Sequence, residues 1–424
     1  MTETTDRAYP HGKRVAPLYT EAPDQQPGFR SNPWWDMVQE HAVEKEFAAN
    51  DWALERLNHG ASGLLFYLYD HQYLPRILRD IDLRYIHLGL VVEGSGPEVM
   101  EALLHHAHNE VLPLDQMHGF LNIDPVEIAA RTGYWDEAKM YDLGELSRLA
   151  PPKFKYMCVN ANFYGACGAS ASTQLGLALA HIDFYLEAFG EVGLKQYWLA
   201  LTAGTHMFEE MAKIRAMRLL WGRLLETYGL PQVHLEIYAE TSIQNQSALD
   251  VETNLLRAAS AAFGAITGGA DALQIRPYTA VLGANDAEAE RLALNQHFLF
   301  AYESFLDRVE DPAAGSYFIE TLTQELCESA WEIAQEVREM GGIVSALKSN
   351  WIQDKIWAEA SEAKPSEYLG VNKFPAATGF PEGFKPASPV SRAAHQKQYA
   401  QCDIEPLRTV RWAAALEKEH GKKV

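Results

Sequence analysis

The alternation of two patterns along residues 46–350 constrains the fold of this chain more than any other feature. Short runs of aliphatic, aromatic and β-branched residues recur along the chain, and stretches with helical periodicity separate them. Runs of this length and composition are typical of buried parallel strands. A strand–helix unit that repeats seven or eight times predicts a (β/α)8 TIM barrel, which is an α/β fold. The predicted strands lie at 62–69, 85–92, 119–124, 156–161, 197–202, 235–241 and 272–278.

Two of the intervening segments carry a clear apolar stripe. In 206–229 and 318–340, apolar residues recur every three or four positions, which predicts two amphipathic helices. Ser247, followed three residues later by Asp250, resembles a capping box and predicts the start of a helix that carries Asn254.

Composition divides the chain into three parts. Residues 1–45 are polar and rich in proline, with aromatic residues interspersed, so they cannot form a core by themselves. We expect them to form an extended arm that lies along the barrel or along a partner. Residues 46–350 form the predicted barrel. Residues 351–424, where proline and glycine return, are expected to be an irregular C-terminal extension.

Charge and cysteine usage limit the partners and the compartment. The formal net charge of −21 argues against nucleic acid and against an anionic membrane surface, because both attract basic patches. The four cysteines form no CxxC pair, which fits a reducing cytosol. No apolar stretch is suited to a secretory signal or long enough to span a bilayer. We therefore expect a soluble, cytoplasmic protein.

Several long segments of the chain carry a family resemblance, namely FYGACGASASTQLGLALAHIDFYLEAFGEVGL, MFEEMAKIRAMRLLWGRLLETYG, DVETNLLRAASAAFGAITGGADALQIRPY, RLALNQHFLFAYESFLDRVEDPAAGSYFIE and GVNKFP. They resemble the methylmalonyl-CoA mutase family, and they occur in the family's own order. The resemblance covers most of residues 30–380. It implies an acyl-CoA-binding barrel whose axis is threaded by the pantetheine of CoA, and a separate domain that carries cobalamin on a DxHxxG loop.

The cobalamin loop of the family has no match in this sequence. Asp70-His71 begins like the loop, but Gln72-Tyr73-Leu74-Pro75 follows and the glycine is missing. The sequence after the predicted barrel offers no other match before Val424. We therefore expect that this chain binds no cofactor and that a partner subunit holds adenosylcobalamin.

The positions that match the family's catalytic residues carry other side chains. Catalytic members have a Tyr-His pair at the end of the fourth strand, and the matching residues here are Asn162 and Phe163. Phenylalanine cannot donate a hydrogen bond or a proton. A WTIRQY-like stretch of the family matches 35–40, where Val38 replaces its Arg and Glu40 replaces its catalytic Tyr. The resemblance therefore implies that this chain has no catalytic residue.

Three further positions depart from the catalytic pattern. Asn122 replaces a Gln of a GTIQND-like motif, and Glu236 and Glu240 replace an Arg and a Gln of an RTHSQTSG-like motif. These departures resemble the family's small, non-catalytic subunit. The sequence does not define a substrate-binding set, and the candidates at the barrel mouth are Asn122, Tyr164, Glu236, Tyr238 and Glu240.

Two clusters look like sites but have simpler explanations. His105, His106 and His108 could suggest a metal site, but His105 and His106 would point about 100° apart on a helix and nothing fixes a third ligand. We therefore interpret these histidines as a solvated helix face and predict no metal site. A basic group on 206–229 could contact CoA phosphates. Helical spacing spreads it over an outer face, where Glu209 and Glu210 are the expected partners. The basic group consists of Lys213, Arg215, Arg218 and Arg223.

These observations favour the small subunit of a heterodimeric methylmalonyl-CoA mutase, with a structural role beside a catalytic large subunit and a possible homodimer in isolation. Two alternatives stay open. One is the substrate-binding subunit of a split acyl-CoA mutase completed by a separate cobalamin-binding protein, and the other is a stand-alone barrel with an unrelated ligand. An open cavity lined by the polar candidates would favour the stand-alone barrel. A cavity plugged by Phe163, Tyr164 and Tyr238 would favour the structural role.

Overall fold

The computed structural model describes residues 7–8, 14–15, 33–283, 286–362, 367–375, 380–381, 384 and 392–421. Near the N-terminus, β1 (Arg7–Ala8) pairs antiparallel with β2 (Arg14–Val15). Apart from this pair, the part of the predicted arm that precedes residue 33 lies outside the described residues.

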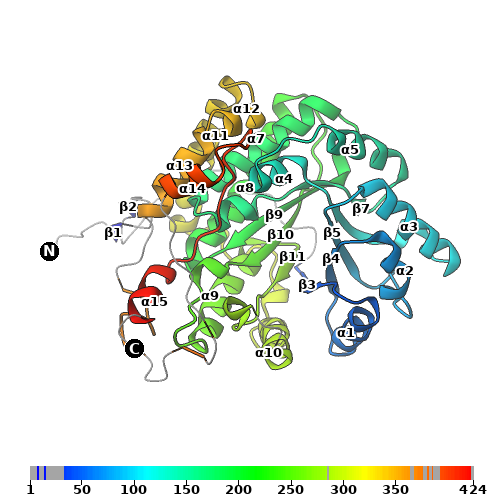
Figure 1. The fold of residues 1–424 in the computed structure, drawn as a ribbon, viewed down its shortest axis with the longest axis horizontal. Coiled ribbons are helices and arrows are strands. Elements are labelled where there is room, and N and C mark those ends of the chain that lie inside the picture. The colour runs from blue at the N-terminus through cyan, green and yellow to red at the C-terminus, as the bar shows by residue number, and fades with distance from the viewer. Residues whose placement is uncertain are drawn as a thin grey trace.

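A parallel sheet wrapped into a barrel forms the centre of the molecule (Figure 1). Its order is β7-β6-β5-β4-β3-β11-β10-β9-β8, and every neighbouring pair is parallel. Only Tyr156 separates β7 from β8, so the two ends of this order meet. The predicted (β/α)8 TIM barrel is confirmed. The strands are β3 (Asp36–Ala42), β4 (Gly63–Leu68), β5 (His87–Val92), β6 (His118–Asn122), β7 (Phe154–Lys155), β8 (Met157–Val159), β9 (Tyr197–Ala203), β10 (Glu236–Thr241) and β11 (Ala272–Gln274).

All seven predicted strands are present, but the sequence pattern does not predict β3. This strand pairs with β4 on one side and β11 on the other, so the barrel starts at Asp36 rather than at residue 46. The pattern misses β3 because Gln39 and Glu40 interrupt its apolar run. Residues 36–42 therefore form a barrel strand and are not part of an extended arm.

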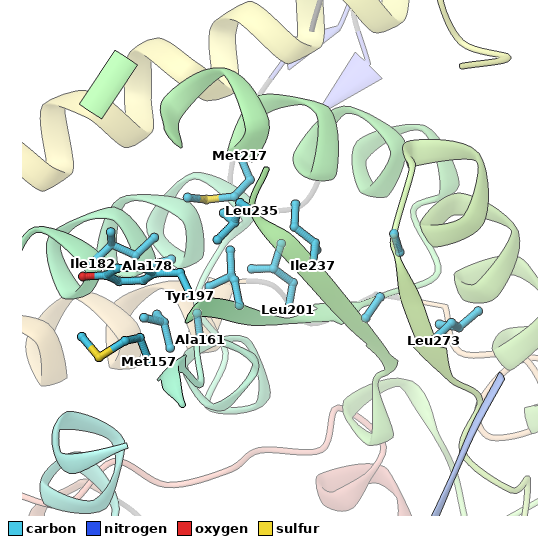
Figure 2. Packing of buried hydrophobic residues seen from close by; sticks show 14 of the residues in the cluster. Met157, Ala161, Ala178, Ile182, Tyr197, Leu201, Met217, Leu235, Ile237 and Leu273 are labelled. Atoms are coloured by element: carbon cyan, nitrogen blue, oxygen red, sulfur yellow. The ribbon is translucent and has the colours of Figure 1, made fainter. Parts of the chain in front are cut away.

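Helices surround the sheet and cover its outer face (Figure 1). Figure 2 shows Ile182 of α7 and Met217 of α8 over Tyr197, Leu201 and Ile237 of the sheet, all within one buried apolar cluster. None of the helices in the described part of the chain combines the length and apolar character that crossing a membrane requires. The α-helices are α1 (Glu46–Asn58), α2 (Leu74–Ile77), α3 (Gly96–Asn109), α4 (Pro125–Thr132), α5 (Ala138–Leu149), α6 (Asn162–Ala166), α7 (Ala171–Phe189), α8 (Met207–Thr227), α9 (Thr253–Gly268), α10 (Ala287–Phe298), α11 (Tyr317–Glu339), α12 (Ile343–Lys348), α13 (Trp351–Glu362), α14 (Arg392–Gln398) and α15 (Ala414–Gly421).

The two helices predicted from their apolar stripes are confirmed as α8 and α11, but the predicted capping box is wrong. Helix α9 begins at Thr253, and its N-cap residue makes no side-chain cap bond. Ser247 is held instead by the buried amide of Asn254, whose Oδ1 accepts from the Ser247 amide at 3.0 Å and whose Nδ2 donates to the Ser247 carbonyl at 2.9 Å. This local lock leaves Ser247 six residues before the helix.

Three of the four basic residues on α8 are buried, so the prediction of a solvated outer face is wrong for them. Helix α8 packs between the sheet and α11, and Lys213, Arg215 and Arg218 point into these contacts. Arg215 donates to Glu320 at 2.6 Å, and Arg218 donates to Asp271 at 3.0 Å. Lys213 forms an ion pair with Glu210, one of the two predicted partners, which lies one turn earlier on the same helix.

The histidines of α3 are divided between two environments. His105 and His108 are exposed, as expected for a solvated face, whereas His106 is buried. The prediction therefore holds for two of the three residues.

The C-terminal part of the chain returns to the barrel. Between α14 and α15 an extended segment, red in Figure 1, passes along the carboxyl end of the sheet. The amide of Val410 donates to the carbonyl of Ala166 on α6 at 2.9 Å, and the amide of Trp412 donates to the carbonyl of Gln244 after β10 at 3.1 Å. The segment is thus attached to the loops that border the barrel mouth.

Candidate functional site

The carboxyl ends of the strands bring three predicted positions together around Arg276, which the sequence did not single out. Arg276 follows β11 and donates from Nη1 to Glu40 Oε1 at 2.9 Å and from Nε to Glu240 Oε1 at 2.6 Å. Asn162 Nδ2 donates to Glu240 Oε2 at 3.1 Å. Tyr67 OH donates to Glu40 Oε2 at 3.1 Å. The guanidinium therefore lies between two carboxylates whose other oxygens also have partners.

Burial and charge pairing set the electrostatics of this group, which is called the mouth cluster below. Its members are Glu40, Tyr67, Asn162, Glu240 and Arg276. Burial raises the pKa of Glu240; Arg276 opposes the rise and the charge of Glu40 adds to it. Burial alone lowers the pKa of Arg276, but the two carboxylates raise it above its ordinary value. The one guanidinium is thus committed to two acids.

The residues that match the family's Tyr-His pair lie at the start of α6. Asn162 reaches the mouth cluster, but Phe163 packs half-buried against the core between the sheet and the helices. Tyr164 is buried in the same cluster, with its ring centroid 6.4 Å from that of His181. Successive residues of a helix point about 100° apart. Phe163 and Tyr164, two of the three rings whose place on the axis would favour the structural role, therefore belong to the outer core instead.

A different set of aromatic side chains fills the barrel axis. Phe120 of β6 stacks on Trp198 of β9 with centroids 3.8 Å apart, and Trp198 lies 5.2 Å from Tyr238 of β10. Their exposed fractions are 0%, 2% and 1%. Alternate residues of a strand share a face, which explains how three strands direct these rings inward. The axis is a packed core. The smaller side chains packed with these rings are Val38, Leu65, Cys158, Ala200 and Ala272.

The other two polar candidates, Asn122 and Glu236, do not belong to the mouth cluster. Asn122 ends β6 and lines a cavity of about 300 Å³. Glu40 and Arg276 line a separate cavity of about 210 Å³. Glu236 is the first residue of β10, at the opposite end of the barrel, with Oε1 3.6 Å from His87 Nδ1. The polar candidates therefore do not line one shared cavity.

Comparisons with known proteins agree with this geometry. Residues 68–418 match the model of the methylmalonyl-CoA mutase family. The chain is 34% identical to the methylmalonyl-CoA mutase small subunit of Streptomyces virginiae, over 89% of this chain and 67% of that protein. The chain belongs to the methylmalonyl-CoA mutase family. The small subunit of Porphyromonas gingivalis is 29% identical over 94% of this chain and 68% of its own length. That of Propionibacterium freudenreichii subsp. shermanii is 29% identical over 80% and 55%.

Membership of the mutase family implies that the enzyme uses adenosylcobalamin. Among the described residues, the Asp70-His71 pair begins like the family's cobalamin loop. Asp70 Oδ1 accepts from the Gln72 amide at 2.9 Å and opens a short 3-10 turn after β4. His71 Nδ1 lies 3.6 Å from Glu98 Oε2. Without the glycine, and with its histidine beside a carboxylate, this loop does not fit cobalamin.

The residues of this mutase-family barrel that the sequence did not single out are Arg276, Phe120 and Trp198. Phe120 and Trp198 lie within predicted strands, and two-residue alternation places each on one face. The pattern cannot tell which face is the interior, because both faces of a parallel barrel strand are apolar. For Arg276, the sequence shows only that it lies near the end of a predicted strand, which is not enough to predict its pairing with Glu40 and Glu240.

Proposed function

We propose that this chain is a structural subunit of a methylmalonyl-CoA mutase, the enzyme that isomerises methylmalonyl-CoA to succinyl-CoA, and that it supplies no catalytic side chain. The filled barrel axis carries this proposal. A pantetheine chain would have to pass where Phe120, Trp198 and Tyr238 are stacked and almost fully buried. Interiors packed at this density do not admit a ligand without a large rearrangement.

The mouth cluster supports the same proposal. The Tyr and His that catalytic members present are Asn162 and Phe163 here, and Phe163 packs in the outer core. The one cation described at the mouth cluster, Arg276, is held by Glu40 and Glu240.

We further propose a catalytic large subunit as the partner in a heterodimer, with adenosylcobalamin held by that partner. The relatives' name of small subunit supports a larger partner. The poor fit of the Asp70-His71 loop supports placing the cofactor elsewhere. The four cysteines, all of them free, fit a reducing compartment and support a cytoplasmic enzyme.

The two alternative functions are less well supported. A substrate-binding subunit of a split mutase would need an axis open to CoA. A stand-alone barrel would need the polar candidates to share a cavity, and Glu236 lies at the other end of the barrel from Asn162 and Glu240.

The test is to co-express the full chain with the cobalamin-binding mutase subunit of the same organism and to measure stoichiometry and isomerase activity. We expect a one-to-one complex by light scattering. Phe163→His should change kcat/KM by less than about twofold, because the side chain does not face the reacting groups. The matched control removes the histidine of the partner's own Tyr-His pair, which should lower activity by about 10²–10⁴.

Two results would contradict the proposal. One is binding of a CoA ester to the isolated chain in calorimetry. The other is an Asn162→Ala complex of normal stoichiometry with strongly reduced kcat, because that would place the mouth cluster in the reaction.

A further inference from the structure

The amino end of the barrel gathers metal-binding side chains that the mutase reaction does not use. Asp36 opens β3, His87 opens β5 and His118 opens β6. One potential ligand atom from each of the three lies within 4.8 Å of the other two. Because the strands are parallel and their first residues share one end, side chains from non-adjacent strands converge there.

The backbone of the intervening strand makes this convergence possible. Gly63 opens β4, pairs with His87 in register and has no side chain, so Asp36 reaches His87 across it. Asp36 Oδ2 lies 3.2 Å from His87 Nδ1, and Ser62 donates to the other carboxylate oxygen at 3.1 Å. A hydroxyl that fixes a carboxylate in this way is typical of the outer shell of a metal site.

The spacing of the donor atoms suits a small divalent ion. Ligands about 2.0–2.2 Å from a tetrahedral zinc ion are about 3.3–3.6 Å from one another. The Nδ1 of His87 lies 3.2 Å from Asp36 Oδ2 and 3.6 Å from Glu236 Oε1. Asp36, His87 and His118 thus form the set of three ligands, and Glu236 adds a second carboxylate beside His87. The ring of His118 is edge-on to that of His87, with the two centroids 5.9 Å apart.

The burial and charge of the cluster also indicate a ligand. His87 is 2% exposed, and its Nδ1 faces the carboxylates of Asp36 and Glu236. Two carboxylates and two imidazoles face one nearby cation, Lys155, whose Nζ lies 3.7 Å from Glu236 and donates to a backbone carbonyl at 2.7 Å. Two imidazole nitrogens with carboxylate oxygens form a donor set that suits zinc and related transition metals.

We propose that the amino end of the barrel binds one divalent transition-metal ion of the zinc class, with Asp36, His87 and His118 as its protein ligands. The site is structural, because the end of a barrel opposite the βα loops contributes to stability rather than catalysis. The ion would link β3 with β5 and β6, and β4 separates β3 from β5 in the sheet. This proposal does not depend on the proposed function.

The test uses the full chain, treated with a chelator, dialysed and titrated with Co²⁺ as a spectroscopic probe and with Zn²⁺ as a competitor. We expect one equivalent of Co²⁺ to produce visible ligand-field absorption of tetrahedral type, and Zn²⁺ to displace it. Metal content by mass spectrometry should reach one ion per chain, and Zn²⁺ should raise the melting temperature.

Variants locate the ion. His118→Gln, at a partly exposed position, should fold normally by circular dichroism and bind Co²⁺ at least about tenfold more weakly. Asp36→Asn should weaken binding in the same way. His108→Ala, which changes an exposed histidine on α3, is the matched control and should bind like the parent chain. The proposal is overturned if the parent chain takes up no Co²⁺, or if His118→Gln and His108→Ala bind it equally well.

Discussion

Asp271, immediately before β11, is a single residue whose ionisation ties three elements together. Its carboxylate accepts from Arg218 of α8 at 3.0 Å and from the Ile237 amide of β10 at 2.8 Å, and His234 Nε2 lies 3.0 Å away. Burial alone would raise the pKa of this acid, but Arg218 and His234 lower it to about 2. The charged form of Asp271 therefore stabilises the fold.

Asp271→Asn should lower the free energy of unfolding by about 2–4 kcal/mol at pH 7. The sign follows from the depressed pKa. The contribution is present above the unfolded pKa of 3.8 and is lost as the pH falls through about 2. Urea unfolding of parent and variant at several pH values between 7 and 3 measures the difference. A difference that stays constant down to pH 3 would contradict the role of the charge.

Single residues are also where prediction from the sequence was weakest. Motif comparison identified Asn162 and Phe163 as departures, but it left open whether Phe163 lies on the axis, and the structure places it against the outer core. The plug depends on which face of each strand points inward, and no pattern of apolar residues fixes that in a parallel barrel. The buried pairs of Arg215 and Arg218 were missed for a related reason. Their partners, Glu320 and Asp271, are distant in the sequence.

At the scale of elements, α7 and α11 show how closely two helices approach over a glycine. A Cβ at Gly176 of α7 would lie 2.6 Å from Ile333 Cβ and 2.8 Å from the Ala330 carbonyl oxygen, both on α11. Gly144 on α5 is the opposite case, because a Cβ there would meet nothing closer than a ring carbon of Phe189 at 4.0 Å.

Gly176→Ala should therefore destabilise the protein by about 1–3 kcal/mol, since overpacking outweighs the gain in helix propensity. Gly144→Ala, the matched control, should stabilise it by about 0.5–1 kcal/mol because only the propensity term remains. Denaturant midpoints of the two variants provide the comparison. Equal midpoints would mean that α11 moves aside without cost.

Elements were more predictable than residues because periodicity is a local property of the chain. The seven predicted strands and the helices α8 and α11 follow directly from apolar spacing. The pattern does not predict β3 because Glu40, which accepts a hydrogen bond from Arg276 in the mouth cluster, interrupts the apolar run of the strand. The start of α9 was predicted wrongly because the spacing of Ser247 and Asp250 resembles a capping box in the sequence. In the structure the backbone of Ser247 bonds to the side chain of Asn254 instead.

On the scale of the whole molecule, the barrel is organised around its filled axis. Phe120, Trp198 and Tyr238 come from three strands and meet at the centre of the sheet. We expect Trp198→Ala to destabilise the fold by about 3–5 kcal/mol, because the cavity would be enclosed by strands that cannot collapse inward. An exposed aromatic, Tyr134→Ala, should change stability by less than about 0.5 kcal/mol. If urea unfolding gave both variants the same stability, the rings would not be part of the core.

The filled axis also has a thermodynamic consequence. A barrel that binds a metabolite gains stability in proportion to the logarithm of ligand concentration over its dissociation constant. Where side chains of the protein itself occupy the axis, that dependence vanishes, and the folded fraction no longer varies with the supply of acyl-CoA. The stability of this barrel is then the same whether acyl-CoA is scarce or abundant in the cell.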